Sequence, residues 1–394
     1  MGNQQAYSIK RDRESTLGML VFRRRSNADS ARDKVAASDR AAISTSNRVA
    51  HPRRVVQIYQ NRFNNSHHSL SPTVSNRQRS RGRACQRWAK RLTSLQMEDL
   101  VNEYQENRGY VPTIAQKCSH AKQSTHNRYR DIECIESTRV ILKYRKQEEN
   151  YIHANWVKVN KQRYICTQGP INHTVDDFWS MILQEKVGAI VMLCGIVEDG
   201  MKKCAEYWPQ EVGGKKKYGE IEVENSSISY NSLPKVQITV LLTSYKKQTH
   251  TITHFQWLGW PDDGIPDDLN LPFKLLRMAK DSCRPQNFGE SNMPILVHCS
   301  AGVGRTGTLV AMDMARERLK SSKEDGLKMP QIMRELRDQR AHSIQCTLQY
   351  LYLNASLLQN CIEEHHVEED EAIRNWLSKY RKFAKDYADY DIRR

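Results

Sequence analysis

The stretch HCSAGVGRTG, residues 298–307, decides how its part of the chain must fold. It follows the apolar run PILV at 294–297, which is typical of a buried strand, and it precedes TLVAM at 308–312, where a helical pattern begins. A strand therefore delivers Cys299 into a tight, glycine-containing loop, and the loop opens directly into a helix. This geometry predicts an anion cradle at the helix N-terminus.

The predicted cradle suits phosphoryl chemistry. Arg305, six residues after the thiol, can grip two phosphoryl oxygens with its planar fork. The loop amides and the helix N-terminus supply a field that stabilises a thiolate, which makes Cys299 a nucleophile. The alternative is a structural cysteine beside a chance glycine-rich turn, and the strand-loop-helix context disfavours it. The residues expected to line the cradle with backbone N–H groups are Ser300, Ala301, Gly302, Val303 and Gly304.

Along the remaining sequence, short strand patterns come before longer helical patterns. The expected strands cover residues 139–142, 151–159, 164–167, 189–193, 221–229 and 235–243. The expected helices cover residues 176–185, 271–282, 307–320, 329–339 and 348–363. This order predicts an α/β (α+β) fold with helices around a mixed central sheet.

Charge divides the chain into unequal parts. Among 394 residues, 61 Lys and Arg stand against 45 Asp and Glu, and nearly all of the formal +16 excess lies before residue 95. Residues 1–92 mix Arg, Ser and Asn without a sustained apolar period, so we expect a basic, disordered extension. Ordered structure is expected to begin near Thr93 and to form one domain over residues 93–365. Residues 366–394 are expected to form an amphipathic C-terminal helix or tail that packs on this domain.

Composition also argues against membrane and secreted classes. The longest clean apolar stretch, residues 189–197, is well short of the roughly 20 residues that span a bilayer. The ten cysteines are scattered without a CxxC pair, and the first 30 residues lack the apolar centre of a secretory signal. We therefore expect a reduced, cytoplasmic protein without a transmembrane segment.

The loop around Cys299 resembles the signature loop of the cysteine-dependent protein tyrosine phosphatases, and further motifs follow in that family's order. NRYRD at 127–131 resembles the family's phosphotyrosine-recognition loop, and WPD at 260–262 resembles its mobile acid loop. QR at 339–340 and QCTLQ at 345–349 resemble its water-positioning segment. The resemblance covers roughly residues 95–365. It implies a single catalytic domain of the classical, non-receptor type, built on a highly twisted mixed sheet.

Hydrolysis of an aryl phosphate needs a nucleophile, charge stabilisation and a proton for the leaving group. Cys299 would form a phosphocysteine, Arg305 would hold the phosphoryl oxygens, and Asp262 would protonate the tyrosine oxygen. In the second step Asp262 would act as general base while Gln345 orients the water. Thr306 would hydrogen-bond the departing thiolate. No metal and no cofactor are expected, since Arg305 and the loop amides supply the positive charge.

The resemblance implies the remaining roles. Tyr129 would form one wall of the pocket and Asp131 would accept hydrogen bonds from the substrate backbone, so that a phosphoserine is too short to reach the thiol. Glu198 would brace the signature arginine, and Lys203 would contact the acid-loop aspartate. The alternative for Tyr129 is a tyrosine buried in the core, and the alternative for Glu198 and Lys203 is a solvated turn of mixed charge. The other residues expected at the site are His298, Trp260 and Gln349.

Some positions depart from the family's pattern. Asp263 follows the acid, where histidine or phenylalanine is usual, and a second carboxylate there would shift the acid limb of the pH–rate profile upward by like-charge repulsion. Cys346 stands where threonine is typical, although both glutamines of that segment are present. None of these changes removes a catalytic group.

We expect an active phosphatase that acts on tyrosine-phosphorylated proteins. One alternative is a catalytically silent phosphotyrosine-binding module, which would usually lack the aspartate, the cysteine or the arginine. Another is a phosphoinositide phosphatase, which would not be expected to carry the loop of Tyr129. The basic extension could tether the enzyme to an anionic partner, such as an acidic protein, a lipid surface or RNA, in a peripheral or nuclear association.

Overall fold

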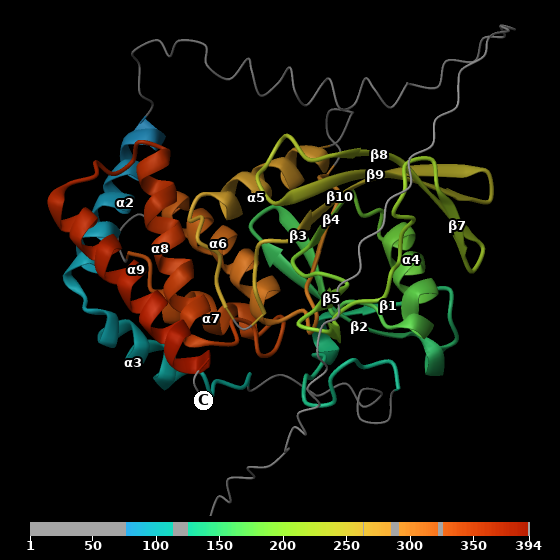
Figure 1. Cartoon of the computed structure of the whole chain (residues 1–394), viewed down its shortest axis with the longest axis horizontal. Helices are drawn as coiled ribbons and strands as arrows, with labels where there is room; N and C mark the ends of the chain where they lie inside the picture. Colours follow the sequence, from blue (N-terminus) through green and yellow to red (C-terminus); the bar gives the residue numbers. More distant parts are fainter. Residues whose placement is uncertain (1–75, 113–124, 263, 285–290, 322–325, 393–394) are drawn as a thin grey trace, which may run out of the picture. The chain divides into compact units, whose positions relative to one another are not determined.

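The centre of the structure is a nine-stranded mixed sheet (Figure 1). A computed structural model describes residues 76–112, 125–262, 264–284, 291–321 and 326–392. The strand order is β1-β2-β3-β11-β4-β10-β9-β8-β7, in which β11 runs parallel to β3 and β4, and β10 runs parallel to β4. The other neighbours are antiparallel. This is the mixed sheet that the sequence predicts.

The strands of this sheet are β1 (Arg139–Ile141), β2 (Tyr151–Val159), β3 (Gln162–Thr167), β4 (Ala189–Met192), β7 (Lys215–Tyr218), β8 (Ile221–Ser229), β9 (Val236–Tyr245), β10 (Gln248–Trp257) and β11 (Ile295–His298). A separate hairpin is formed by β5 (Val197–Glu198) and β6 (Met201–Lys202). Strands β4 and β11 are buried along their whole length, which explains their continuous apolar sequences.

The helices are α2 (Asn76–Ser94), α3 (Met97–Asn107), α4 (Val175–Gln184), α5 (Leu271–Ser282), α6 (Gly304–Ser321), α7 (Met329–Arg337), α8 (Thr347–Glu363) and α9 (Glu371–Ile392). Short 3-10 turns cover Glu136–Thr138, Gln147–Glu149 and Asn172–Thr174. Helices α5 and α6 pack on the central strands, whereas α2, α3, α8 and α9 lie together at one side of the sheet (Figure 1). No helix in the described ranges is both long enough and apolar enough to cross a bilayer.

Helix α2 corrects the expected start of ordered structure. The sequence predicts a disordered segment up to residue 92, but the helix begins at Asn76 and packs against α6 and α9. The sequence of this helix is rich in arginine, but apolar residues recur between the arginines at helical spacing and form one buried face. The residues of the stripe are Ala84, Cys85, Trp88, Ala89 and Leu92. The rest of the predicted extension, residues 1–75, lies outside the described residues.

The C-terminal helix α9 packs on the domain, as the sequence predicts. Its buried face carries Ile373, Trp376, Leu377 and Tyr380. The indole Nε1 of Trp376 also donates a hydrogen bond to the backbone oxygen of Leu95, at 3.2 Å. This bond joins α9 to the turn between α2 and α3, and α9 also packs on α2, α3 and α8.

Strand β10 is absent from the sequence prediction. Its residues 249–254 read THTITH, a polar pattern that does not look like a central strand. The structure places this strand between β4 and β9, where His254 is fully buried and bonded to the hydroxyl of Tyr207, at 2.7 Å. Tertiary hydrogen bonding therefore lets polar side chains occupy the core.

Candidate active site

The loop between β11 and α6 carries the predicted nucleophile. Strand β11 ends at His298 and α6 begins at Gly304, so Cys299 lies in the turn that enters the helix. Gly302 has a φ of +72°, and a Cβ at this position would lie 2.1 Å from the backbone oxygen of Thr167. Only glycine fits there, because it has no Cβ and tolerates positive φ.

Three carbonyl groups of this loop bond to groups outside it. Arg340, which is fully buried, donates from Nε to the oxygen of Gly302 and from Nη2 to the oxygen of Ala301, both at 3.1 Å. The N–H of Gly169 donates to the oxygen of Ser300 at 2.9 Å. With these carbonyls held, the N–H of Gly302 donates to the Sγ of Cys299, at 3.2 Å.

Cys299 is 3% exposed. Val303 and Gly304, at the end of the same loop, are also buried. Thr306, in the first turn of α6, is also buried, and within the described ranges its hydroxyl has no hydrogen-bond partner. A buried hydroxyl without a partner is unusual in a folded protein. It is available to a group that appears only during the reaction.

The guanidinium of Arg305, which is almost fully buried, is held on several sides. Nη1 and Nη2 donate to the two carboxylate oxygens of Glu198, at 2.8 and 2.9 Å. Nη1 also donates to the oxygen of Trp260 at 3.1 Å, and Nη2 to Oδ1 of Asp262 at 2.9 Å. Burial alone would lower the pKa of Arg305, but the hydrogen bond and charge of Glu198 outweigh it and raise the pKa above its ordinary value.

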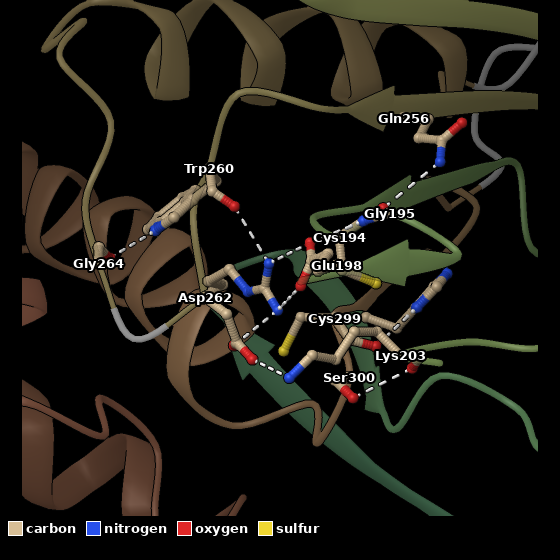
Figure 2. Close-up of polar contacts among 12 residues, drawn as sticks. Cys194, Gly195, Glu198, Lys203, Gln256, Trp260, Asp262, Gly264, Cys299 and Ser300 are labelled. Atoms are coloured by element: carbon tan, nitrogen blue, oxygen red, sulfur yellow. Dashed lines mark hydrogen bonds and ion pairs between the residues drawn. The ribbon is translucent and has the colours of Figure 1, made fainter. Parts of the chain in front are cut away.

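The hairpin β5–β6 positions Glu198 and Lys203. Its turn residues Asp199 and Gly200 have φ values of +49° and +75°, as a type I′ turn requires. The ammonium of Lys203 forms an ion pair with Oδ2 of Asp262 (Figure 2). Burial of Lys203 works to lower its pKa, but the hydrogen bond that its ammonium donates to Asp262 prevails and the pKa is raised. Glu198 and Lys203 therefore form specific ion pairs with Arg305 and Asp262 and do not belong to a merely solvated turn.

The loop of Tyr129 borders the cradle. The half-buried Tyr129 donates its hydroxyl to Oγ of Ser300 at 2.8 Å, and Ser300 in turn donates to the oxygen of Lys203 at 3.1 Å. Tyr129 is thus at the site rather than in the core. Asp131, two residues on, is exposed. Arg128 anchors the loop by donating to the backbone oxygens of residues 169, 170 and 202.

His298 belongs to a buried hydrogen-bonded chain behind the loop. Its Nδ1 lies 3.1 Å from the oxygen of Cys299, and its Nε2 lies 2.8 Å from the hydroxyl of Tyr207, which also contacts Nε2 of His254. Since a carbonyl only accepts, His298 donates from Nδ1 and accepts from Tyr207, and His254 must then donate to Tyr207. Burial lowers the pKa of His298 to about 4 and that of His254 to about 3, so both rings are neutral.

The two glutamines of residues 345–349 lie together over the start of α6. A Cβ on Gly304 would lie 2.9 Å from Oε1 of Gln345 and 3.0 Å from Nε2 of Gln349. Gln349 accepts the backbone N–H of Gln345 at 2.9 Å, and the oxygen of Gln345 accepts the hydroxyl of Tyr104 at 2.6 Å. Gln345 is exposed and Gln349 is buried. Asp263, which the sequence singles out, lies outside the described residues.

Sequence reasoning assigned Arg340, as part of Gln339-Arg340, to the water-positioning segment and missed its contacts with the cradle. Arg340 is 41 positions from Cys299 along the chain, and it acts on backbone carbonyls, which the sequence does not distinguish. The buried contacts of Arg340 with Asn155 Oδ1 at 2.8 Å and His153 Nδ1 at 3.1 Å fix its side chain in turn. Burial lowers the pKa of His153 to about 3, which leaves its nitrogen able to accept.

Comparison with known proteins gives consistent matches. A family model described as protein-tyrosine phosphatase matches residues 123–359. Human tyrosine-protein phosphatase non-receptor type 9 is 33% identical over 284 residues, which cover 68% of this chain and 47% of that protein. Human non-receptor type 4 is 35% identical over 256 residues, which cover 63% of this chain and 26% of that protein. The chain thus spans about half the length of the first relative and about a quarter of the length of the second.

Solved structures agree with the sequence matches. A structure of PTPN18, described as a structural basis for its fingerprint on distinct HER2 tyrosine phosphorylation sites, aligns with a TM-score of 0.60 and 26% identity, covering 70% of this chain and 99% of that one. PTPN18 in complex with HER2 phosphopeptides aligns with a TM-score of 0.58 and 28% identity, covering 66% and 92%.

Proposed function

This chain belongs to the protein-tyrosine phosphatase family, and from that premise we propose that it hydrolyses phosphotyrosine in proteins through a phosphocysteine intermediate. One observation carries the proposal: the N–H of Gly302 points to the thiol of Cys299, and Arg305, at the start of the helix that this loop enters, holds Asp262. Nucleophile, charge stabiliser and acid are therefore together in one site. The solved PTPN18 complex with phosphopeptides supports a phosphoprotein as the substrate class.

In the first step, the thiolate of Cys299 attacks phosphorus, so that an S–P bond forms as the bond from phosphorus to the tyrosine oxygen breaks. Asp262 gives its proton to that oxygen, which leaves as a phenol. Arg305 and the loop amides bind the equatorial phosphoryl oxygens, where negative charge develops. Glu198 keeps the guanidinium aligned for this contact.

In the second step, water attacks the phosphocysteine and the S–P bond breaks. Asp262, now a carboxylate, takes a proton from the water, and Gln345 orients it. The leaving thiolate accepts a hydrogen bond from Thr306, whose hydroxyl is buried and unpartnered within the described ranges. The products are inorganic phosphate and free Cys299.

Selectivity for phosphotyrosine over phosphoserine follows from the depth at which Cys299 lies in the pocket. The ring of Tyr129 forms one wall of the pocket, and an aromatic substrate ring can stack on it. The exposed carboxylate of Asp131 accepts hydrogen bonds from the substrate backbone at the rim. A phosphoserine held at that rim would end short of the buried Cys299.

The alternative is a silent phosphotyrosine-binding module. The convergence of Cys299, Arg305 and Asp262 favours the enzyme, because binding alone needs no acid beside the arginine. Turnover of a phosphotyrosyl peptide and of a phosphoseryl control by the wild type and by Cys299→Ser tests this. We expect hydrolysis of the phosphotyrosyl peptide only, and none by Cys299→Ser. Binding of that peptide by the wild type without hydrolysis would favour the silent module.

Two further proposals concern location. The names of the non-receptor relatives support a cytoplasmic enzyme. The excess of Lys and Arg near the N-terminus supports a tether to an anionic partner, which would be an acidic protein, a lipid surface or RNA, with peripheral or nuclear association. The test compares how strongly the full chain and a form lacking residues 1–75 bind each of these anionic partners as the salt concentration is raised. Equal retention of both forms would exclude it.

A further inference from the structure

The hairpin β5–β6 presents an apolar side chain that the proposed reaction does not use. Two of the eight exposed large apolar side chains in the described part of the chain lie on this hairpin: Val197, 58% exposed, and Met201, 59% exposed. The same hairpin carries Glu198, which holds Arg305. A solvated apolar side chain beside a binding site can gain free energy when a ligand covers it.

The register of the hairpin separates these two side chains. Glu198 pairs with Met201, and Val197 pairs with Lys202. Directly paired residues of an antiparallel ladder project from the same face, and successive residues alternate between faces. Because Glu198 reaches Arg305, Met201 projects from the face directed toward the arginine, and Val197 projects from the opposite face.

The hairpin is tied to both loops that border the pocket. The backbone oxygen of Lys202, the residue after Met201, accepts a hydrogen bond from Arg128 in the loop of the recognition tyrosine, at 3.2 Å. Lys203 pairs with Asp262 in the acid loop. The two residues that follow the exposed Met201 thus contact both loops that border the pocket, so a substrate bound between these loops passes close to the hairpin.

We propose that Met201 is a specificity-determining residue that contacts an apolar side chain of the substrate close to the phosphotyrosine. This inference rests on the proposed function, since it needs a peptide whose phosphotyrosine has entered the pocket. The unbranched thioether of methionine adapts to different aliphatic partners, so leucine, isoleucine and methionine form the preferred class. Covering about 40 Å² of apolar surface would raise kcat/KM about fivefold.

The test uses a phosphotyrosyl peptide with alanine at every flanking position, and two series in which leucine or lysine replaces each alanine in turn. Each kcat/KM is divided by the same enzyme's kcat/KM for p-nitrophenyl phosphate, which has no flanking residues. The enzymes are the wild type, Met201→Ala, Met201→Glu and the matched control Val197→Glu, which alters an equally exposed side chain on the opposite face of the same hairpin.

We expect the wild type to prefer leucine about fivefold at one flanking position or more, Met201→Ala to lose that preference, and Met201→Glu to favour lysine there instead. Val197→Glu should keep the wild-type preference. A wild type indifferent to leucine at every position, an unchanged preference in Met201→Ala, or an equal loss in Val197→Glu would overturn the inference. A wild type that hydrolyses neither p-nitrophenyl phosphate nor any peptide would instead contradict the proposed function, and with it the inference.

Discussion

At the scale of single residues, the hydrogen bonds that Arg305 already makes determine which contact a bound phosphoryl group must displace. Its two terminal nitrogens carry four N–H groups, and they already contact Glu198, Trp260 and Asp262. A phosphoryl group gripped by the fork needs two donors. Glu198 is also held by the N–H of Gly195 at 2.8 Å, so we expect the phosphoryl group to displace Asp262, which frees one of these two donors. Binding would then release the acid that the reaction needs.

This account predicts that Asp262→Ala separates binding from turnover. Its kcat should fall by about 10²–10⁴-fold, because the leaving oxygen loses its proton donor. Its Kd for a phosphotyrosyl peptide should be equal to that of the wild type or lower, because a carboxylate no longer faces the incoming dianion. Steady-state kinetics and calorimetry measure the two quantities. Asp267→Ala, an exposed change in the same loop, is the control; weaker binding by Asp262→Ala would contradict the displacement.

The buried histidines predict a pH dependence of stability. His298 and His254 have folded-state pKa values of about 4 and about 3, below the ordinary value of about 6.5. Below pH 6.5 the unfolded chain therefore binds protons that the folded chain does not, and stability falls as the pH falls. Each ring should cost about 2 kcal/mol of unfolding free energy between pH 7 and pH 5. Urea unfolding at both pH values measures this loss, which should be smaller in His254→Gln; an identical loss in that variant would refute the assignment.

At the scale of elements, the turn from β11 into α6 depends on one glycine. Gly302→Ala places a Cβ against the backbone of Thr167 and should lower kcat/KM by about 100-fold or more, since the cradle amides lose their alignment. Gly326→Ala is the matched control, because Gly326 also has a positive φ, +67°, but has open space around its Cα. It should keep full activity at a small cost in stability. Equal activity of the two variants would show that the turn is not constrained as described.

The packing of α9 against α2 makes a second prediction at this scale. Trp376 is 2% exposed and hydrogen-bonds to Leu95, so Trp376→Ala should lower the free energy of unfolding by about 3–5 kcal/mol. Lys379→Ala, on the exposed side of the same helix, should change it by less than about 0.5 kcal/mol. Denaturant titration compares the two. A Trp376→Ala variant as stable as the wild type would mean that α9 does not stabilise the domain.

At the scale of the whole molecule, local signals were readable from the sequence and long-range ones were not. The loop of residues 298–307 could be interpreted because its strand, glycines and helix are contiguous. Helix α2 was missed although its apolar residues recur at helical spacing, because the many arginines between them made the composition look like that of a disordered segment. Arg340 was assigned to the water-positioning segment, and its bonds to the loop were missed because they are made to backbone carbonyls far away in the sequence. The turn Asp199-Gly200 did carry a readable hairpin signal, which would have placed Met201 and Glu198 on one face.

The central claim is that turnover passes through a covalent bond to Cys299. The most direct measurement is rapid acid quenching during hydrolysis of a phosphotyrosyl peptide, followed by mass spectrometry of the fragment that contains Cys299. We predict a phosphoryl adduct on this thiol, more abundant in Gln345→Ala, because slower attack by water lets the intermediate accumulate. Full turnover by Cys299→Ser, or an adduct on another residue while Cys299 stays unmodified, would contradict the account.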